Sequence, residues 1–464
     1  MIKEKDLPKA YQQAMEELLG EDYPLYLESL KEKPCTGFRV NTLKVLPKEA
    51  KALLDRDFTP VPWVKEGFYF EEERGKLTTP SLSGEEKFFS ISKNPYYFAG
   101  LYYIQEPSAM TPASISGSAP GQRVLDLCAA PGGKSTQLAA MLGGRGLLVS
   151  NDVSASRGKA LLKNLEQAGA GNMLVTNETP QELAKIYPEY FDVVLVDAPC
   201  SGEGMFRRDR AVFSAYLKRG PEAFVPLQKS ILEEAAKMLA PRGTMVYSTC
   251  TYSVKEDEEV LLDFLEKHPD FYVDPIEAAF GFAPSSLLPG AIRLLPHRLR
   301  GEGHFVSRLK RRGEAAGGLL PKRSGNLARL PGELEDFLAH TKKDWDLKRF
   351  LRQRDYIYYL PEEGSLFSGI HYLRTGLLLG EIRKNRFEPF QALAMYLKKE
   401  EWEHPLCLED RDPRVVRYLK GETIEGEEGY KGLRLLCVGE YPLGFTKQEG
   451  TRCKNKYYPG WRWV

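Results

Sequence analysis

The stretch DLCAAPGGKST, residues 126–136, decides the fold. Apolar residues surround Asp126, two glycines follow at Gly132 and Gly133, and a helix-like segment comes next, which predicts a strand, a tight turn and a helix start. A phosphate-binding P-loop requires a glycine five residues before Gly133, but that position holds Cys128, and the Rossmann pattern of three spaced glycines is also missing. Because the free N–H groups of a helix start suit a carboxylate or a phosphate, the stretch fits a cofactor site or simply a well-packed turn.

Apolar runs of strand length alternate with amphipathic segments of helix length on both sides of this stretch. Such alternation predicts β-α-β units and a parallel sheet. The predicted strands lie at 123–128, 145–152, 172–177, 191–199 and 243–250, and the predicted helices at 133–141, 154–167, 181–186, 222–239 and 255–267. GEGHFVSRLKR, residues 301–311, predicts a late antiparallel strand. The second strand ends at Asp152, where doubly wound nucleotide folds place the acid that binds the ribose hydroxyls.

Two of the later predicted strands end close to cysteines. Asp197 and Cys200 stand in VDAPCSGEG, and Cys250 stands in YSTCTYS. Ligands of open α/β sheets lie outside the carboxyl ends of the strands, so these side chains are expected to face the crevice beside the glycine turn. A lone cysteine is usually a small buried hydrophobe, but two cysteines at neighbouring strand ends beside a carboxylate favour chemistry.

Methylation of a pyrimidine at C5 is the chemistry that requires such a set. C5 is too poor a nucleophile until a thiolate adds at C6, and a thiol with a pKa of ~8.5 is little ionised at neutral pH unless a cation or a helix N-terminus lowers that pKa. We expect a protonated Asp197 to hydrogen-bond N3 of the base, and a second thiol to assist release of the first. The spacing leaves open which of Cys200 and Cys250 attacks.

DLCAAPGGKST, VDAPCSGEGMFRRD and YSTCTYS together resemble the bacterial RNA cytosine-C5 methyltransferases of the RsmB/NOP family, in the RsmF-like branch that acts on 16S ribosomal RNA. The resemblance covers nearly the whole chain, through FRVNTLK, GLYYIQEPSAM, GEGHFVSRL and CKNKYYPGWR. It implies an α/β fold with a Rossmann-like S-adenosylmethionine-dependent methyltransferase sheet, an N-terminal α+β cap, and a C-terminal α+β or β-rich, PUA-like RNA-binding module.

The resemblance also implies roles for single residues. Cys250 would be the nucleophile, Cys200 would promote product release, Asp197 would lie near the sulfonium and the target base, and Lys134 would lie near the active site. S-adenosylmethionine would bind Cys128, Ala129, Ala130, Pro131, Gly132, Gly133, Lys134, Asp152, Thr179 and Asp197, and no metal is expected. Thr179 stands where the family often has an acid for the adenine amino group. Asn94 stands where His is common, and KEDE at 255–258 replaces an Asn-containing stretch.

Four segments are predicted along the chain. An N-terminal RNA-binding or cap domain spans 1–100, the catalytic methyltransferase domain 101–312, a linker and intermediate domain 313–390, and a PUA-like RNA-binding domain 391–464. Gly, Pro and basic residues at 311–329 mark the main boundary. Beyond it, LEDFLAHTKKDW predicts a helix and YIYYLPEEG an extended segment.

Composition and charge limit the setting. A formal charge of +1 argues against a uniformly basic coat, although 301–330 and 441–464 are locally basic. The second segment interleaves its basic residues with Tyr441, Phe445, Tyr457, Tyr458, Trp461 and Trp463, a pattern that favours RNA contact. Seven cysteines without a C-x-x-C pair indicate reduced thiols. The charged start and the lack of an apolar run of ~18–20 residues predict a cytoplasmic protein without a membrane segment.

The expected partner is 16S ribosomal RNA or the 30S subunit, bound by a monomer, and Arg207, Arg208 and Arg210 are expected to hold backbone phosphates near the crevice. Two alternatives stay open. One is the same enzyme acting on transfer RNA, and the other is a catalytically silent RNA-binding assembly factor on the same fold. Methylation of an exocyclic amine is disfavoured, because DAPC lacks the Asn-Pro-Pro-aromatic arrangement that grips such an amine.

Overall fold

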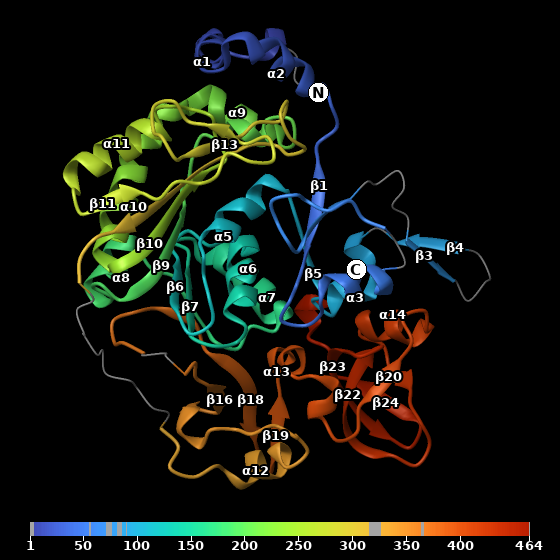
Figure 1. Cartoon of the computed structure of the whole chain (residues 1–464). Coiled ribbons are helices and arrows are strands. Elements are labelled where there is room, and N and C mark those ends of the chain that lie inside the picture. The colour runs from blue at the N-terminus through green and yellow to red at the C-terminus, as the bar shows by residue number, and fades with distance from the viewer. Residues whose placement is uncertain are drawn as a thin grey trace.

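The structure is a computed structural model that describes residues 4–54, 57–70, 77–80, 86–89, 91–314, 326–362 and 366–463. Within these residues the largest sheet has ten strands, in the order β12-β13-β14-β10-β9-β6-β7-β8-β17 with β11 beside β14 (Figure 1). The five central strands run parallel. They are β10 (Leu239–Thr249), β9 (Phe191–Asp197), β6 (Arg123–Asp126), β7 (Leu147–Asn151) and β8 (Met173–Thr176). The predicted Rossmann-like methyltransferase sheet is confirmed.

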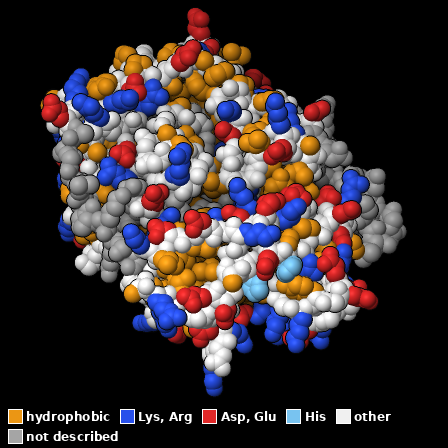
Figure 2. Space-filling model, turned by 60° about the horizontal axis from the view of Figure 1, so that its bottom comes forward, with side chains coloured by type: hydrophobic (Ala, Val, Ile, Leu, Met, Phe, Trp, Pro, Cys, Tyr) orange, Lys and Arg blue, Asp and Glu red, His pale blue; other side chains and the backbone are white. Residues whose placement is uncertain are grey.

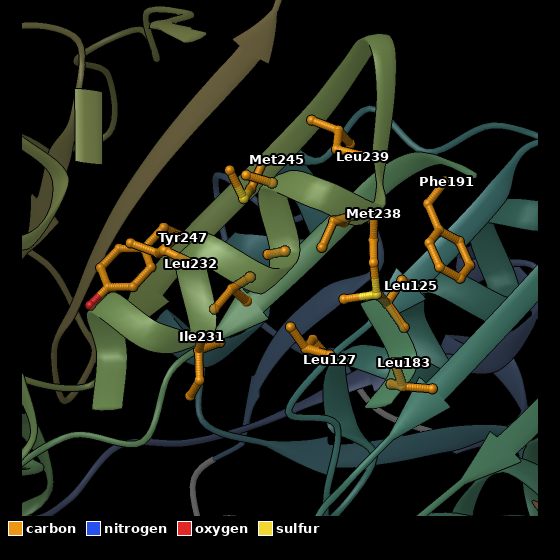
Figure 3. Close-up of a cluster of buried hydrophobic side chains, with 14 of the residues drawn as sticks. Leu125, Leu127, Leu183, Phe191, Ile231, Leu232, Met238, Leu239, Met245 and Tyr247 are labelled. Atoms are coloured by element: carbon orange, nitrogen blue, oxygen red, sulfur yellow. The ribbon is translucent and has the colours of Figure 1, made fainter. Parts of the chain in front are cut away.

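Helices cover both faces of this sheet because its strands are apolar on both sides. Val193 and Leu195 of β9 belong to the core under α6 and α7, whereas Val194 and Val196 belong to the core under α8, α10 and α11. Figure 3 shows the second core, where Met238 of α10 lies beside Leu125, and Ile231 and Leu232 belong to the same cluster. The helices are α6 (Gly133–Leu142), α7 (Ala155–Ala168), α8 (Pro180–Ile186), α10 (Val225–Met238) and α11 (Glu258–Lys267), which confirms the predicted helices with α10 and α11 each starting three residues late.

Antiparallel strands extend the sheet beyond both edges of its five parallel strands. The predicted late strand is confirmed as β14 (His304–Arg311), which runs antiparallel to β10. Three short strands extend that side of the sheet: β11 (Phe271–Val273), β12 (Ala283–Pro284) and β13 (Ile292–Leu294). At the other edge, β17 (Tyr372–Thr375) pairs antiparallel with β8. The largest sheet therefore takes one of its edge strands from the segment 313–390, which the sequence analysis assigns to a linker and intermediate domain.

A buried ion pair fastens this edge strand to the catalytic part. Nη2 of Arg374 lies 2.7 Å from Oε1 of Glu166 on α7, and the two side chains are only 14% and 11% exposed. Burial raises the pKa of Glu166, and the neighbouring guanidinium opposes that rise. Loss of one partner would leave the other charge buried and uncompensated.

We therefore expect Arg374→Ala to lower the free energy of unfolding by about 3 kcal/mol. Denaturant unfolding followed by circular dichroism measures this change. Arg383→Ala is the matched control, because Arg383 is 60% exposed in its ion pair with Glu381 and exposed pairs contribute about 0–1 kcal/mol. Equal small losses in the two variants would contradict an anchoring role for the buried pair.

The first two helices of the N-terminal segment pack on the catalytic domain. α1 (Lys9–Leu19) and α2 (Tyr23–Ser29) share a small core with Phe206, Tyr216 and Tyr252 of the catalytic part. A three-stranded sheet in the order β2-β1-β5 follows. Its strands are β1 (Thr36–Val40), β2 (Gly67–Phe70) and β5 (Tyr102–Gln105), and the remaining N-terminal elements are α3 (Pro47–Leu53), β3 (Leu77–Pro80), β4 (Glu86–Phe89), α4 (Pro95–Phe98) and α5 (Thr111–Ile115).

Two strand-rich units complete the chain. The first contains a sheet in the order β15-β16-β18-β19, and the second a sheet in the order β20-β22-β23-β24-β21, as expected for a β-rich C-terminal module. Of the predicted helix LEDFLAHTKKDW, only the start is helical, and β16 confirms the extended segment up to Tyr359. The elements are α12 (Gly332–Leu338), β15 (Phe350–Gln353), β16 (Tyr356–Tyr359), β18 (Leu377–Arg383), β19 (Arg386–Pro389), α13 (Gln391–Tyr396), β20 (Leu406–Leu408), α14 (Pro413–Leu419), β21 (Ile424–Glu425), β22 (Lys431–Val438), β23 (Tyr441–Glu449) and β24 (Arg452–Asn455).

The two ends of the chain share one hydrophobic core. Phe38 and Val40 of β1 belong to the same buried cluster as Tyr457 and Trp461, and Figure 1 shows the C-terminus beside α3. The rings of Phe98 and Trp463 stack with their centroids 5.2 Å apart. The N-terminal segment therefore packs against the C-terminal module as well as the catalytic domain.

This packing corrects the expectation of RNA contact for three of the six C-terminal aromatic residues, which are buried. Phe445, Tyr457 and Trp461 are between 2% and 6% exposed, whereas Tyr458 is 48% exposed. The physical reason is that a module of this size needs large apolar side chains to fill its own core. Its basic residues lie among acidic ones: Figure 2, which brings the lower face of Figure 1 forward, shows Lys and Arg next to Asp and Glu over much of that face.

Some sequence predictions fall on residues that the structure does not describe. Residues 315–325, at the centre of the predicted boundary and basic stretch, lie outside the described residues, as do the last two residues of YIYYLPEEG. Among the residues that are described, no helix has the length and apolar character needed to cross a bilayer.

Candidate active site

The two cysteines of the strand ends lie together at the carboxyl edge of the sheet. Asp197 of β9 stands opposite Ser248 of β10, so the loops after these strands start side by side. The Sγ atoms of Cys200 and Cys250 are 3.4 Å apart, and both side chains are half-buried. The structure thus brings together the two thiols that the sequence places 50 residues apart.

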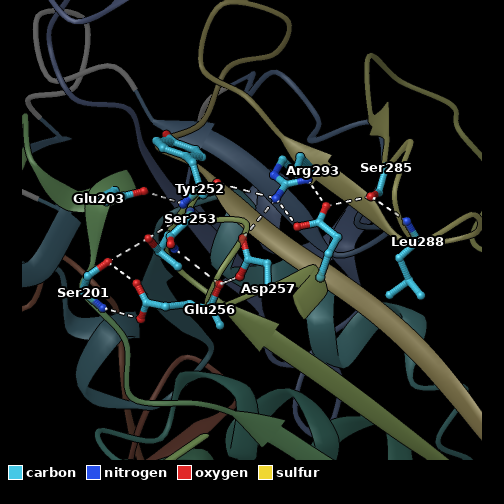
Figure 4. Close-up of polar contacts among 12 residues, drawn as sticks. Ser201, Glu203, Tyr252, Ser253, Glu256, Asp257, Ser285, Leu288 and Arg293 are labelled. Atoms are coloured by element: carbon cyan, nitrogen blue, oxygen red, sulfur yellow. Dashed lines mark hydrogen bonds and ion pairs between the residues drawn. The ribbon is translucent and has the colours of Figure 1, made fainter. Parts of the chain in front are cut away.

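Each cysteine loop holds the other through a buried carboxylate (Figure 4). Glu203, just after Cys200, accepts a hydrogen bond from the N–H of Tyr252 at 3.0 Å. Glu256, just after Cys250, accepts from the N–H of Ser201 at 2.9 Å. The N–H of Gly204 donates to the carbonyl oxygen of Cys250 at 2.9 Å. These reciprocal contacts fix the backbone around both thiols, so the short distance between the sulfurs is built into the loops.

More buried acids stand behind the Cys250 loop. Glu258 forms an ion pair with Arg293 and accepts a hydrogen bond from the Ser285 hydroxyl at 2.6 Å. Asp257 accepts from the Thr249 hydroxyl at 2.6 Å, and its other oxygen lies 3.5 Å from the Arg293 guanidinium. Burial raises the pKa of Asp257 well above its ordinary value. The Arg293 guanidinium therefore lies between two buried carboxyl groups, those of Asp257 and Glu258.

Asp197 lies at the centre of a polar group of side chains beside the thiols. One of its oxygens is 2.6 Å from Nζ of Lys134, and the other accepts a hydrogen bond from the Ser248 hydroxyl at 2.7 Å. Nε2 of His304 lies 3.6 Å from that second oxygen. Burial alone would raise the pKa of Asp197, but the Lys134 ammonium and the His304 ring outweigh it and hold that pKa well below its ordinary value. Asp197 is therefore ionised, which corrects the expectation of a protonated carboxyl.

His304 is a site residue that the sequence analysis missed. It begins β14, the strand that runs antiparallel to β10 beside Cys250. The sequence contained a usable signal, because His304 lies near the start of the predicted strand 301–311 and a histidine at a strand end can face the same crevice as the cysteines.

The glycine turn lies beside this group, at the ends of β6 and β7. The Ala130–Pro131 peptide bond is cis, and Gly132 has a φ of 111°, in the left-handed region that favours glycine. One oxygen of Asp152 accepts from the N–H of Ala130 at 3.2 Å, and the other accepts from Ser154 at 2.9 Å. The turn is therefore fastened to the acid that ends the next strand.

Two buried groups stand under the turn. Asp126 accepts a hydrogen bond from the Ser135 hydroxyl at 2.6 Å, while its Oδ1 has no hydrogen-bond partner among the described residues. Burial raises the pKa of Asp126 to about 7. Burial also raises the pKa of the Cys128 thiol, so this cysteine is uncharged at neutral pH.

These residues fit S-adenosylmethionine by the chemistry of their polar groups. The start of α6 presents backbone N–H groups to a carboxylate, and Asp152 keeps further lone pairs for ribose hydroxyls because each of its oxygens accepts only one backbone N–H at hydrogen-bond distance. Thr179 caps α8 instead, with its hydroxyl accepting from the N–H of Glu182 at 3.3 Å. Among the described residues, no three His, Cys, Asp or Glu side chains cluster in a way that would hold a metal ion.

Arg207 does not have the role expected from the sequence. Its Nε lies 2.5 Å from Oε2 of Glu302, its terminal nitrogens donate to the carbonyl oxygens of Ser29 and Gly301, and its side chain is 6% exposed. The buried Glu302 carboxylate requires a counter-ion, so Arg207 is committed to the fold and is not exposed to phosphates. Arg208 and Arg210 remain exposed.

Family models match the chain along most of its length. Residues 115–310 match the model described as 16S rRNA methyltransferase RsmB/F. Residues 7–107 match the N-terminal domain of 16S rRNA methyltransferase RsmF, residues 336–397 its first C-terminal domain, and residues 405–463 the methyltransferase RsmF PUA domain.

Curated relatives and solved structures agree with these matches. Ribosomal RNA small subunit methyltransferase F of Erwinia tasmaniensis is 31% identical over 97% of this chain and 95% of its own length. The protein of the same name from Shigella boydii is 30% identical over 91% of this chain and 89% of its own. The crystal structure of a methyltransferase homolog from Pyrococcus horikoshii has a TM-score of 0.55 and 29% identity over 66% of this chain and 95% of that chain. NSun6 from the same organism, solved with SFG, shares the fold at a TM-score of 0.56 and 20% identity, over 66% of this chain and 99% of that chain. The chain belongs to the RsmB/F family of 16S rRNA methyltransferases and carries the N-terminal, first C-terminal and PUA domains of RsmF.

Proposed function

We propose that this protein methylates C5 of cytosine in 16S ribosomal RNA, using S-adenosylmethionine and a covalent bond between Cys250 and C6 of the base. The observation that carries the proposal is the pair of thiols 3.4 Å apart beside an ionised Asp197 at the carboxyl edge of a methyltransferase sheet. The family relationship supports ribosomal RNA as the substrate.

S-adenosylmethionine supplies the methyl group when it is bound. Residues 128–134 and Asp152 would hold it through the helix start and the carboxylate described above, with Asp197 at the far end of the site. Thr179 would contact the adenine end from its position at the start of α8. The ion pair between Lys134 and Asp197 links this cofactor edge to the thiols.

The electrostatics of Cys200 support the other thiol, Cys250, as the nucleophile. A hydrogen bond with Cys250 and burial raise the pKa of Cys200 well above its ordinary value, so Cys200 is held as a neutral thiol. After methyl transfer the same thiol stands ready to assist the departure of Cys250 from C6.

Asp197 would orient the target base. An ionised carboxylate accepts a hydrogen bond from the exocyclic amine of cytosine and from N3 once N3 carries a proton. Lys134 and Ser248 hold the carboxylate in place from two sides. We also propose that the N-terminal segment 1–100 and the C-terminal segment 391–464 dock the RNA around the target base, and that the protein acts as a cytoplasmic monomer.

Methyl transfer from labelled S-adenosylmethionine to 16S RNA and to 30S particles tests the proposal. The expected product is 5-methylcytidine in one of these two forms of the RNA, with little label in transfer RNA. Label in transfer RNA alone would make transfer RNA the substrate. No label in any RNA would favour the catalytically silent assembly factor. The pair of catalytic thiols argues against that second function, because a scaffold needs no such pair.

A further inference from the structure

A basic cleft opens between the N-terminal segment and the catalytic domain. It encloses 1020 Å³ and is lined by residues 32–36, by 296–301 and by Arg207 and Arg208. Its walls carry five Arg or Lys side chains and one acidic side chain: Lys33, Arg207, Arg208, Arg298, Arg300 and Glu32. Such an excess of positive charge in a concave surface attracts an anionic chain.

The arginines of this cleft are held in place by contacts within the protein. Arg207 is paired with Glu302, and Arg298 with Asp22 at 2.7 Å. Arg208 donates to the carbonyl oxygen of Cys35 at 2.6 Å, a contact that orients the guanidinium and leaves its charge in place. The guanidinium of Arg300 lies 4.4 Å from the centre of the Tyr69 ring, so the ring fixes its plane as well.

The segment that forms one side of the cleft continues along the chain to the candidate active site. The lining residue Gly301 accepts a hydrogen bond from Arg207, and the next residue, Glu302, accepts from the N–H of Cys35 at 2.6 Å. Glu302 is two residues before His304, which lies beside Asp197. A Cβ atom placed on Gly204, in the Cys200 loop, would lie 3.0 Å from the carbonyl oxygen of Gly303. The cleft and the loop that holds Cys200 therefore lie on the two sides of the short segment 301–304.

We propose that this cleft binds the sugar-phosphate backbone of the single-stranded RNA segment that adjoins the target cytosine. This inference rests on the proposed function and adds the path of the substrate. Arg208 and Arg300 contact phosphates, and the stacked Arg300 and Tyr69 offer a flat surface for a neighbouring base. An unpaired strand suits the site because the target base must leave its stack to reach a half-buried thiol.

Charge reversal of the two exposed arginines, Arg208→Glu with Arg300→Glu, tests the proposal. A fluorescently labelled single-stranded 16S RNA fragment is titrated with the protein, and its anisotropy is followed over a range of salt concentrations. We expect at least ~10-fold weaker binding, and a salt dependence shallower by about 1.4 because each lost contact to a single strand removes about 0.7 from the slope. The KM for S-adenosylmethionine stays unchanged. Lys384→Glu with Arg386→Glu, in the turn between β18 and β19, is the control.

The outcomes separate this proposal from the proposed function. If the wild type binds RNA through the cleft but transfers no methyl group, the proposed function is wrong and the proposal that the cleft binds RNA is supported. If the wild type methylates RNA while the reversed variant binds as tightly as the control, the cleft proposal is overturned. The neutral pair Arg208→Gln with Arg300→Gln guards against misfolding, and we expect it to show a smaller loss in the same direction.

A second inference comes from the hydrogen bonds of His304. Its Nδ1 lies 2.8 Å from the carbonyl oxygen of Gly303, which only accepts hydrogen bonds, so Nδ1 carries a proton. Its Nε2 has no hydrogen-bond partner among the described residues, and the residue is 4% exposed. Nε2 lies 3.6 Å from an Asp197 oxygen, so the ring nitrogen that is left without a hydrogen bond faces the carboxylate beside the thiols.

We propose that His304 supplies, through Asp197, the proton that N3 of cytosine takes up when the Cys250 thiolate adds at C6. As the S–C6 bond forms, the C5=C6 electron pair moves to C4–C5 and the C4=N3 pair moves onto N3. His304 Nε2 first passes its proton to the ionised Asp197, and Asp197 passes it on to N3, so Asp197 is a carboxylate before and after the transfer. After methyl transfer, solvent water removes the C5 proton, the C5–H electron pair forms C5=C6, and the thiolate leaves C6 with the S–C6 pair. The N3 proton then returns to His304 along the same path, so His304 is a positioning residue that ends each cycle unchanged.

Chemical rescue tests this role. We expect His304→Ala to slow single-turnover methyl transfer by about 10²-fold, the scale of a lost proton transfer. Imidazole added to the buffer raises the rate of His304→Ala by at least ~10-fold. The rate of His304→Gln stays low, because glutamine offers a hydrogen bond but no transferable proton. Full activity in either variant, or a loss that imidazole does not restore in a folded His304→Ala protein, would overturn the proposal.

Discussion

Cys250→Ala is expected to abolish methyl transfer, with a single-turnover rate lower by at least ~10⁴-fold, a loss typical of a missing nucleophile. Without the Sγ atom no bond to C6 forms, and C5 stays too electron-poor to accept a methyl group. The measurement is the incorporation of labelled methyl groups into 16S RNA or 30S particles at saturating protein. Cys407→Ala is the control, because Cys407 is an exposed cysteine far along the chain in β20.

Cys200→Ala provides the other half of this prediction. Attack by Cys250 remains, while release loses the neighbouring thiol at 3.4 Å, so a covalent protein–RNA complex accumulates. The complex appears as a band of lower mobility on a denaturing gel and disappears after ribonuclease treatment. A trapped complex in Cys250→Ala and none in Cys200→Ala would exchange the roles of the two thiols.

Asp197→Asn is expected to lower the single-turnover rate by about 10²–10³-fold, the usual cost of a lost group that stabilises charge in the transition state. The neutral amide does not neutralise the charge of the Lys134 ammonium, which lies 2.6 Å from the Asp197 carboxylate. It is also a weaker hydrogen-bond acceptor for the protonated N3. The rate is measured at saturating S-adenosylmethionine and RNA, so the change is separated from a change in binding.

Asp192→Asn is the matched control for this substitution. Asp192 lies on the same strand, but at its amino end, where it accepts hydrogen bonds from the backbone and guanidinium of Arg123. We expect a stability change there and an unaltered rate in the folded protein. Equal rates for Asp197→Asn and wild type would remove Asp197 from the chemistry.

Residues at strand ends were predictable from the sequence because their position follows from one topological rule. In a parallel sheet the carboxyl ends meet at one edge, so Asp126, Asp152, Asp197 and Cys250 had to converge once the strands were recognised. The role of each residue still came from the family resemblance. The charge state of Asp197 did not follow from either, since it depends on Lys134 and His304, which reach it from other elements.

Non-local pairing explains most of what the sequence did not reveal. β17 is four residues long and pairs with β8, nearly two hundred residues earlier, so no local pattern marks it as part of the catalytic sheet. The sequence predicts that Arg207 binds phosphate because it follows the Pro-Cys motif. In the structure it forms an ion pair with Glu302, which lies in a loop far along the chain. Aromatic residues among basic ones, such as Tyr457 and Trp461, have the same sequence pattern whether they face RNA or a core.

The core that joins the two chain ends, and the late arrival of β17, have a consequence for synthesis. The N-terminal strands leave the ribosome first, but they meet Tyr457 and Trp461 only after those residues have been added. Contacts between such distant residues form slowly, because a long loop must close before they stabilise anything. A nascent chain that stops short of β17 leaves β8 without this partner strand, and one that stops short of Tyr457 leaves part of the core around Phe38 uncovered.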